Sequence, residues 1–404
     1  MSPAIVFDDG QGALGPLTDL RPSMLVRTGA FTTIERLRLL LALEAEAELC
    51  TLWVPAELEA LAREQTDLPV NDPEALPDDP EGILLFNGRC PVPPDEAWTL
   101  QLGAAILDDT AAVVAARLDA PAARRFLSSG SLPDRVRTTR LTTPALLNHP
   151  WDVIRFRDRA FEIDLEVMLA RETQPLPPGV IAVDDERVRI SPEALVYPSV
   201  VIDAEQGPVI IDEHATIRPG AILIGPAYIG PGSTVLDRAL IKPHTAIGPV
   251  CKVAGEVGGT IFQGFANKAH DGHLGDSWVG QWANLGAGTT NSNLLNTYGS
   301  VVAQAEPNSP RVRTGLTFLG CIIADHVKLA IMTRVMTGSV FGTGSMIADP
   351  APPTAVGRFE WLTGERRQPF RFEKFLEVAR AAMARRKVEP SPAYLARLRA
   401  LAGA

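Results

Sequence analysis

The residues with the clearest chemical potential lie close together between Asn267 and Leu294, in the segment NKAHDGHLGDSWVGQWANLGAGTTNSNL. This segment holds two of the chain's six histidines, His270 and His273, among glycines and asparagines. A histidine side chain has an unperturbed pKa of about 6.5, so it can take up and release a proton near neutral pH. Asparagine can bind a polar ligand, but it also suits tight turns because it tolerates left-handed backbone conformations. The segment is therefore a candidate site for proton transfer.

An aliphatic residue recurs at every sixth position through the chain that precedes this segment. Neither an α-helix, with a period of 3.6, nor an ordinary strand, with a period of 2, fits this spacing. A period of six is typical of hexapeptide repeats, which predict a parallel β-helix with one short flat side for each hexapeptide. The aliphatic side chains would point inward, and Gly, Pro or Asn would turn the corners. The members of this first register are Ile211, Ile217, Leu223, Ile229, Val235, Ile241, Ile247 and Val253.

The phase of the repeat then slips by two residues, and a second register begins. Two of its positions are polar, so His273 could either contact a ligand or pack in the core. After an irregular stretch, YGSVVAQAEPNSPRVRTG, a third register appears. The second register is Ile261, Asn267, His273, Val279 and Leu285, and the third is Ile323, Leu329, Val335, Phe341 and Ile347.

The remaining segments predict an α/β domain before the β-helix and helices after it. Residues 1–148 alternate strand-like runs, such as AIVFDD and ILLFNG, with helix-like runs, such as TTIERLRLLLALEAEA, which favours a mostly parallel sheet. Residues 149–185 are predicted to be a helical connector and a proline-rich linker, and residues 186–350 hold the repeats. Residues 351–404 contain two amphipathic helical patterns.

The composition limits the classes of partner that we expect. The chain has 404 residues, of which 46% are hydrophobic and 21% charged, and its formal net charge is −10. An acidic chain is a poor general binder of nucleic acid or of anionic membranes. No apolar run approaches the roughly 20 residues of a membrane span, and the four widely spaced cysteines favour reduced thiols. We therefore expect a cytoplasmic protein without nucleic-acid or membrane partners.

Motifs in the polar segment resemble those of a known enzyme family. KAH at residues 268–270, LGD at 274–276, NLGAGT at 284–289 and the further Asn293 resemble the acetyltransferase site of the bacterial bifunctional glucosamine-1-phosphate N-acetyltransferase/N-acetylglucosamine-1-phosphate uridyltransferase family. Other motifs are still more similar to a shorter, alternative branch of that family. They are FNGR, HPWD, AHDGHLGD and NLGAGTTNSNLLNTYGS. The resemblance implies an α/β nucleotidyltransferase-like domain, a left-handed parallel β-helix with C-terminal helices, and a homotrimer.

The resemblance also implies roles for residues of the β-helix. His270 falls in the position of the general base, which takes a proton from a sugar ammonium group because only the neutral amine attacks a thioester. The thioester donor would be acetyl-CoA. The other contacts that the resemblance implies are Lys252, Lys268, His273 and Asn284 for the amino-sugar phosphate, and Asn293 for acetyl-CoA.

The first domain departs from the nucleotidyltransferase pattern. Gly10 and Gly12 keep part of the glycine-rich loop that wraps a triphosphate in that family. The segment PLTDLRP is recognisable, but Ser23 stands where the resemblance implies a lysine, and Arg89 stands where it implies a metal-binding aspartate. Two aspartates beside the loop would repel a triphosphate unless Mg²⁺ were bound. A substitute nucleotide-binding set would combine the two glycines with a phosphate cradle formed by Arg21, Arg27 and Arg89.

Four functions compete on this reading. The leading hypothesis is acetyl-CoA-dependent N-acetylation of an amino-sugar phosphate in sugar-nucleotide biosynthesis, with nucleotidyl transfer in the first domain as a second activity. Nucleotidyl transfer alone would leave the β-helix as an oligomerisation stalk, and a silent scaffold would bind a sugar nucleotide without turnover. A β-helical zinc enzyme is the weakest alternative, because three histidines would have to converge on the metal and His270-x-x-His273 lacks the expected spacing.

Overall fold

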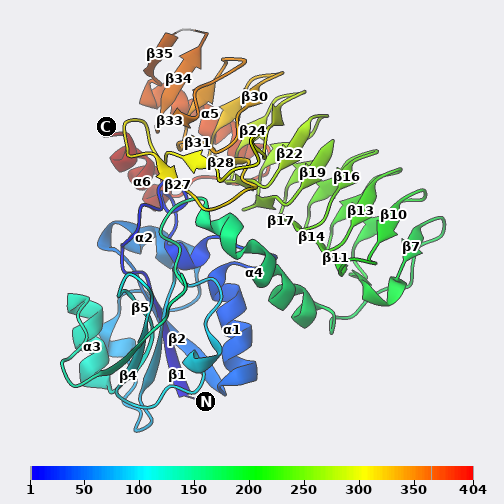
Figure 1. The fold of residues 1–404 in the computed structure, drawn as a ribbon. Helices are drawn as coiled ribbons and strands as arrows, with labels where there is room; N and C mark the ends of the chain where they lie inside the picture. The colour runs from blue at the N-terminus through cyan, green and yellow to red at the C-terminus, as the bar shows by residue number, and fades with distance from the viewer. Residues whose placement is uncertain (1, 365, 404) are drawn as a thin grey trace.

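The computed structural model describes residues 2–364 and 366–403. An α/β lobe lies at one end of the molecule, a stack of short strands extends away from it, and one long helix runs between the two (Figure 1). The sheet of the lobe has the strand order β2-β1-β3-β5-β4-β6. The elements of the lobe are β1 (Ser2–Phe7), α1 (Thr33–Glu44), β2 (Ala47–Trp53), α2 (Ala56–Gln65), β3 (Ile83–Asn87), β4 (Ala104–Leu107), β5 (Val113–Leu118), α3 (Ala120–Ser129) and β6 (Arg137–Arg140), with single 3₁₀ turns at Ser23–Leu25, Pro73–Ala75 and Asp95–Ala97.

The sheet of the lobe is mixed. β1 pairs in parallel with β2 and β3, and β4 pairs in parallel with β6, whereas β5 runs antiparallel to β3 and β4. β1 is buried along almost its whole length, which explains its unbroken apolar sequence. The strand-like runs AIVFDD, LCTLWV, ILLFNG and AAILDD correctly predicted β1 to β4, whereas β5 and β6 were not predicted.

The stacked strands form the parallel β-helix that the six-residue spacing predicted, in the left-handed form that the family resemblance implied. Its strands belong to three sheets, here named sheets C, D and E, and the coils up to residue 285 visit them in that order. Sheet C contains β7 (Ile181–Val183), β10 (Val201–Asp203), β13 (Ile222–Ile224), β16 (Leu240–Ile241), β19 (Glu256–Gly258) and β22 (His273–Gly275). Sheet D contains β8 (Val188–Ile190), β11 (Val209–Ile211), β14 (Ala227–Ile229), β17 (Thr245–Ile247), β20 (Ile261–Phe262), β23 (Trp278–Val279), β28 (Cys321–Ile323), β31 (Ser339–Phe341) and β33 (Ala355–Val356). Sheet E contains β9 (Leu195–Val196), β12 (Thr216–Ile217), β15 (Thr234–Val235), β18 (Lys252–Val253), β21 (Asn267–Lys268), β24 (Asn284–Leu285), β29 (Lys328–Leu329), β32 (Met346–Ile347), β34 (Glu360–Thr363) and the antiparallel β35 (Arg366–Pro369).

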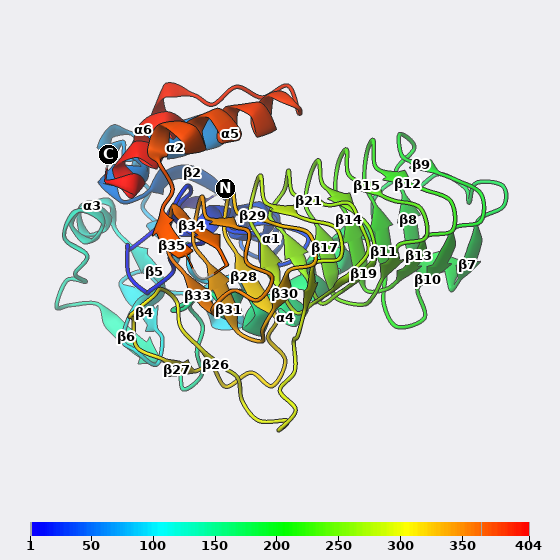
Figure 2. The same cartoon turned by 90° about the horizontal axis from the view of Figure 1, so that it is seen from above.

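Two smaller pairings lie beyond β22, the last strand of sheet C. The strands β25 (Thr290–Asn291) and β30 (Arg334–Val335) pair in parallel, and β26 (Val302–Ala303) forms an antiparallel hairpin with β27 (Val312–Arg313). This hairpin belongs to a loop that projects from the side of the β-helix (Figure 2). It corresponds to the irregular stretch between the second and third registers.

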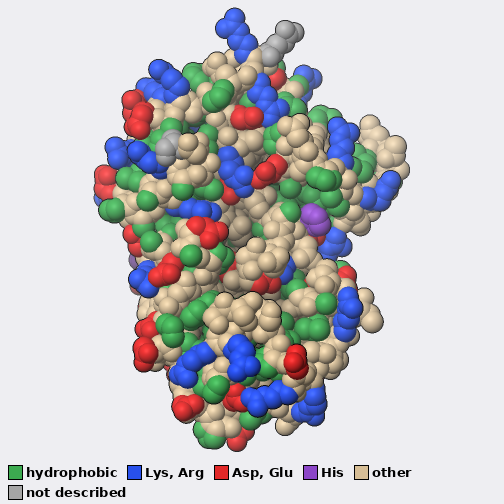
Figure 3. Space-filling model, turned by 90° about the vertical axis from the view of Figure 1, so that its left-hand side faces the viewer, with side chains coloured by type: hydrophobic (Ala, Val, Ile, Leu, Met, Phe, Trp, Pro, Cys, Tyr) green, Lys and Arg blue, Asp and Glu red, His purple; other side chains and the backbone are tan. Residues whose placement is uncertain are grey.

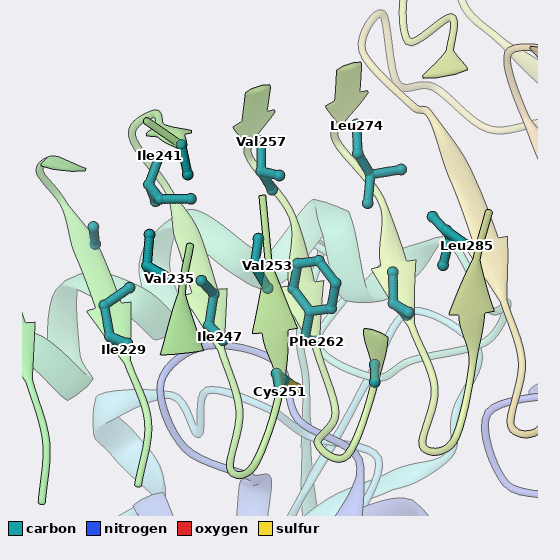
Figure 4. Close-up of a cluster of buried hydrophobic side chains, with 14 of the residues drawn as sticks. Ile229, Val235, Ile241, Ile247, Cys251, Val253, Val257, Phe262, Leu274 and Leu285 are labelled. Carbon is teal, nitrogen blue, oxygen red and sulfur yellow. The ribbon is translucent and has the colours of Figure 1, made fainter. Parts of the chain in front are cut away.

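Inward-pointing aliphatic side chains fill the β-helix, as Figure 4 shows for the coils between Ile229 and Leu285. Every member of the first and third registers is buried in this core, so both registers are confirmed. The second register is correct at Val279 and Leu285, and it is wrong by one residue before them. The inward residues there are Phe262, Lys268 and Leu274, instead of the predicted Ile261, Asn267 and His273.

The coils become shorter where the second register fails. The core residues Val253, Val257 and Phe262 are four and five residues apart instead of six, so the inward phase moves by three positions, one more than predicted. A further short interval of five residues between Leu274 and Val279 returns the chain to the predicted register. Ile261 consequently points outward and packs with Trp278 in a second cluster on the outer face of sheet D. Helix α4 (Asp152–Met168), the predicted connector, covers this face with residues such as Phe161.

The C-terminal helices α5 (Phe372–Ala384) and α6 (Pro392–Ala402) lie along the last coils and beside α2 (Figure 2). Their apolar residues Phe375 and Leu398 pack in one cluster with Leu61 of α2 and Trp282 of the β-helix.

Figure 3 views the molecule from the left of Figure 1, and on that face basic and acidic side chains are intermixed rather than gathered into one basic surface. Within the described part of the chain, no helix combines the length and the apolar character that a membrane span needs.

Candidate functional site

His270 lies on the corner between sheet E and sheet C, two residues after β21 ends. Its side chain is exposed and lines a hollow of about 520 Å³ that follows this corner across several coils. The walls of the hollow are mainly apolar, and Ile331 and Met332 are 69% and 66% exposed there. The other ionisable residues of the hollow are Asp237 and Asp271. An exposed imidazole above an exposed apolar wall can exchange a proton with a ligand whose apolar part lies along the coils.

Lys268 lies directly behind this hollow, inside the β-helix. It pairs in sheet E with Val253, occupies an inward position and is only 2% exposed. Its Nζ donates hydrogen bonds to the carbonyl oxygens of Ala254 at 2.9 Å and of His270 at 3.0 Å. Burial of the ammonium group lowers the pKa of Lys268 to about 8, although the nearby Asp271 carboxylate acts in the opposite direction. In this position the ammonium does not face solvent, so it is not presented to a sugar phosphate as the sequence suggested.

His273 begins β22 and points away from the core, on the outer face of sheet C. Its Nδ1 lies 3.3 Å from the carbonyl oxygen of Asn291, and its Nε2 lies 4.0 Å from a carboxylate oxygen of Glu256. The alternative of a packed core histidine is therefore wrong, because the neighbouring Leu274 takes the core position. The half-buried ring remains accessible to a ligand on sheet C.

Asn284 and Lys252 lie on the outer face of sheet E, around the corner from His270. Register pairing stacks Lys252, Asn267, Asn284 and Lys328 in one ladder. The Asn267 side-chain amide donates to the Asn284 amide oxygen at 2.8 Å, and Lys252 is exposed. These two predicted substrate contacts therefore share a face with each other, and His273 lies on a different face.

Asn293 follows β25 and lies beside the corner between sheets C and D. Its side-chain amide donates to a carboxylate oxygen of Asp276 at 2.7 Å. The other oxygen of Asp276 accepts a hydrogen bond from Arg157 of helix α4 at 2.7 Å. Asn293 is thus part of a link between the β-helix and the connector, which sequence reasoning missed because Arg157 is remote in the chain.

The predicted site residues therefore surround the β-helix rather than meeting in one cavity. His270 occupies the E/C corner, His273 the face of sheet C, and Asn293 the C/D corner. Of the predicted site residues, all of which lie in the described part of the chain, only His270 lines the hollow at the E/C corner. A complete site that used all of these side chains would need surfaces from more than one chain.

The glycine loop of the first lobe follows β1 at the carboxyl ends of the parallel strands. Gly10 and Gly12 have positive φ angles of 64° and 82°, which side-chain-bearing residues rarely adopt. Both glycines line a hollow of about 340 Å³ that Arg358 and Arg397 also reach, and Gly10 lines a second hollow of about 550 Å³ beside Trp53. The loop therefore keeps the position of a ligand-binding loop in an α/β sheet.

Arg89 is committed to an ion pair with an aspartate of this loop. Its Nε and Nη2 donate to the two carboxylate oxygens of Asp9 at 2.8 Å and 2.7 Å, and its Nη1 donates to Leu147 O and to Asn148 Oδ1. Burial alone would raise the pKa of Asp9, but the Arg89 guanidinium outweighs it, so the pKa is lowered. The Asp9 carboxylate already has its counter-ion, so these residues do not fit a magnesium site. The described residues also contain no group of three or more His, Cys, Asp or Glu side chains arranged to hold a metal ion.

Arg21 and Arg27 serve the contact between the lobe and the β-helix. Arg21 is 3% exposed and its Nη2 lies 2.9 Å from Asp325 Oδ1. The backbone N–H of Arg27 donates to Gln263 at 2.8 Å, and its guanidinium donates to the carbonyl oxygen of Ala30. The predicted cradle of Arg21, Arg27 and Arg89 is therefore not formed, because each guanidinium is buried against a different partner.

The segment PLTDLRP has the same role, which the sequence did not reveal. Asp19 accepts hydrogen bonds from Thr343 at 2.6 Å and from Arg358 at 2.7 Å, both of them residues of the last coils. Arg397 of α6 donates to the carbonyl oxygen of Asp19 at 2.8 Å. The chain segment that would contact phosphate in a nucleotidyltransferase thus joins three parts of this molecule.

Comparisons with known proteins match parts of this chain. Residues 4–173 match the family described as sugar nucleotidyl transferase. The bifunctional protein GlmU of Exiguobacterium sp. is 24% identical over 233 residues, which cover 51% of this chain and 48% of that protein. The bifunctional sugar-1-phosphate nucleotidylyltransferase/acetyltransferase of Sulfurisphaera tokodaii is 29% identical over 144 residues, 35% of each chain. The matched regions thus span about half or less of the length of these relatives.

Solved structures that match part of this chain include a hexapeptide transferase family protein from Anaplasma phagocytophilum, 17% identical, covering 53% of this chain and 92% of that chain with a TM-score of 0.21. The UDP-N-acetylglucosamine acyltransferase of Campylobacter jejuni is 11% identical, covering 53% and 86% with a TM-score of 0.26. Likeness at this level says nothing about substrate. The family match and the relatives confirm the resemblance read from the sequence: the chain joins a sugar-nucleotidyl-transferase-like region to a hexapeptide β-helix, and its relatives are transferases.

Proposed function

We propose that the β-helix transfers an acetyl group from acetyl-CoA to the amine of an amino-sugar phosphate, with His270 as the general base. The observation that carries the proposal is the position of His270, an exposed imidazole on a largely apolar hollow, within the motif KAH. The relatives that are named as both nucleotidylyltransferases and acetyltransferases support the same chemistry. The apolar corner would hold the acyl donor, and the imidazole would face the amine.

In the proposed reaction His270 takes a proton from the sugar ammonium group. The neutral nitrogen then attacks the thioester carbonyl carbon, a C–N bond forms, and the negative charge moves to the carbonyl oxygen. When that oxygen re-forms its double bond, the C–S bond breaks and the sulfur leaves with the electron pair. The imidazolium of His270 gives its proton to the sulfur, which regenerates the base. The new amide nitrogen loses its second proton to solvent, so the net reaction releases one proton. Asn284 and His273 would hold the sugar, and Lys252 is the exposed cation available for its phosphate.

We further propose a homotrimer whose sites lie between neighbouring β-helices. The separation of His270 and Asn293 on two different corners supports this assembly, because one chain alone does not present both to one ligand. In a trimer, the C/D corner of one chain could complete the E/C corner of the next. A mass near three times 43.4 kDa in light scattering is the expected result, and a monomeric mass at micromolar concentration would contradict it.

The experiment that tests the proposal uses two impaired variants, His270→Ala and Asn293→Ala, assayed at an acetyl-CoA concentration below the KM of Asn293→Ala. Each alone should acetylate glucosamine-1-phosphate poorly, measured by release of the CoA thiol. If the two residues act across an interface, unfolding the two variants together and refolding them as an equal mixture should restore activity. About a quarter of the interfaces then combine His270 from one chain with Asn293 from its neighbour. A His270→Ala protein with the parent rate would refute the role of His270. Inactive mixed trimers would refute a site shared between chains.

For the first lobe we propose a scaffold that keeps the nucleotidyltransferase shape without its metal-dependent chemistry. The buried pair Arg89–Asp9 and the linking role of Arg21 support this proposal. Nucleotidyl transfer is the second candidate, because Gly10 and Gly12 still line two hollows. Calorimetry with UTP and the other common nucleoside triphosphates, with and without Mg²⁺, should give no binding heat. Heat accompanied by pyrophosphate release on addition of a sugar-1-phosphate would instead establish nucleotidyl transfer.

A further inference from the structure

A lysine inside a β-helix is an unusual feature of this molecule. The other inward positions around it are apolar, with Val253 beside it in sheet E and Leu274 as the next core residue along the chain. An ammonium group loses its hydration when it is buried, so such a position costs stability unless the group has a compensating role. The hydrogen bonds of Lys268 indicate what that role is.

The ammonium of Lys268 joins two successive coils at the same corner. Ala254 follows β18 and His270 follows β21, and both strands belong to sheet E. Their carbonyl oxygens accept hydrogen bonds from one nitrogen at 2.9 Å and 3.0 Å. The space for this nitrogen exists because position 255 is a glycine: a Cβ on Gly255 would lie 3.0 Å from Nζ. The backbone of His270 is therefore held from within the β-helix, while its ring points to the outside.

We propose that Lys268 is a positioning residue for His270, which it fixes through the backbone carbonyl of that residue. This inference rests on the proposed function, in which His270 is the base. Lys268 does not contact substrate, since it is buried, and it acts by limiting the directions that the imidazole can take above the hollow. Misplacement of a reacting group by about 1 Å can reduce a rate by about 100-fold.

The test compares Lys268→Met with Lys268→Arg and with Lys374→Met as a control. Methionine has a similar length and no donor, whereas arginine keeps donors in the interior, and Lys374 is an exposed residue of α5. We expect Lys268→Met to lower kcat about 10- to 100-fold and to change KM for the sugar less than about three-fold. Lys268→Arg should retain more activity, and Lys374→Met should equal the parent. A parent-like kcat in Lys268→Met would overturn the proposal.

A second measurement keeps the inference separate from the proposed function. In protein labelled with ¹⁵N-histidine, the imidazole signals of His270 are assigned by their loss in His270→Ala. Lys268→Met should shift these signals, because the carbonyl oxygen of His270 loses the donor that holds its backbone. This readout needs no acetyl transfer. Unchanged signals in a folded Lys268→Met protein would refute the link even if the enzyme had another reaction.

Discussion

The buried ammonium of Lys268 makes a quantitative prediction about stability. The pKa of this lysine falls from 10.5 to about 8 on folding, a difference of 10.5 − 8 = 2.5. At 1.36 kcal/mol for each pKa unit, the folded state carries a cost of about 3 kcal/mol when the group is protonated. Lys268→Met removes this cost and also removes the donors of two carbonyl oxygens, at about 1 kcal/mol each. At pH 7 the methionine variant should therefore be about 1 kcal/mol more stable than the parent.

The sign of the pH dependence follows from linkage. Below pH 8 both the folded and the unfolded lysine hold the proton, so the parent protein carries the full cost of about 3 kcal/mol. Between pH 8 and 10.5 the unfolded chain binds more protons than the folded one, so the stability of the parent rises with pH. The advantage of the methionine variant should disappear near pH 9 and become a disadvantage of about 2 kcal/mol near pH 10.5.

The assay is urea unfolding of the parent and of Lys268→Met, at one protein concentration, at intervals between pH 7 and 10.5. Other groups titrate in this range: burial also lowers the pKa of Lys328 to about 8, and it raises the pKa of Cys90, Cys251 and Cys321 to about 12. They are present in both proteins, so they cancel in the difference between the two unfolding free energies. A difference that stays constant with pH, or that moves in favour of methionine as the pH rises, would refute the reasoning.

Three further predictions concern the corners and the glycine loop. His270→Ala should lower kcat for acetyl transfer by about 10²–10⁴ while acetyl-CoA still binds in calorimetry, and lost binding would contradict its role as base alone. Asn293→Ala should raise KM for acetyl-CoA, and an unchanged KM would show that Asn293 is not part of the site. The variant should also have lower thermal stability, because the Asp276 carboxylate loses a hydrogen-bond donor worth about 1.5–3 kcal/mol. Arg89→Met should lower the free energy of unfolding by about 3 kcal/mol, because Asp9 loses its ion-pair partner. The double variant Asp9→Asn/Arg89→Met should recover part of that loss. An unchanged free energy of unfolding in Arg89→Met would contradict a stabilising ion pair.

The sequence predicted the β-helix because its core depends on one simple rule. The inward side chain of each flat side is aliphatic, so the first and third registers could be read from spacing alone. The rule fails where an inward position is polar. Because an unpaired buried lysine is costly, a pattern search has no reason to place Lys268 inward, and it aligned the adjacent Asn267 instead. The structure determines this position through strand pairing: Lys268 pairs with the inward residue Val253 of the neighbouring coil, so Lys268 also points inward.

The arginines of the first lobe could not be assigned from sequence for a different reason. Their number and position suggested a phosphate cradle, but the partner of a guanidinium depends on chain segments far away. Asp325 lies 304 residues after Arg21, and the hydrogen-bond partner of the Arg27 backbone, Gln263, lies 236 residues after it. A charge that is paired in this way is not available to a triphosphate, since removing it from its partner would leave that partner buried and unsatisfied. Two of the predicted cradle arginines are thus paired within the molecule, Arg21 with Asp325 of the β-helix and Arg89 with Asp9 of the glycine loop.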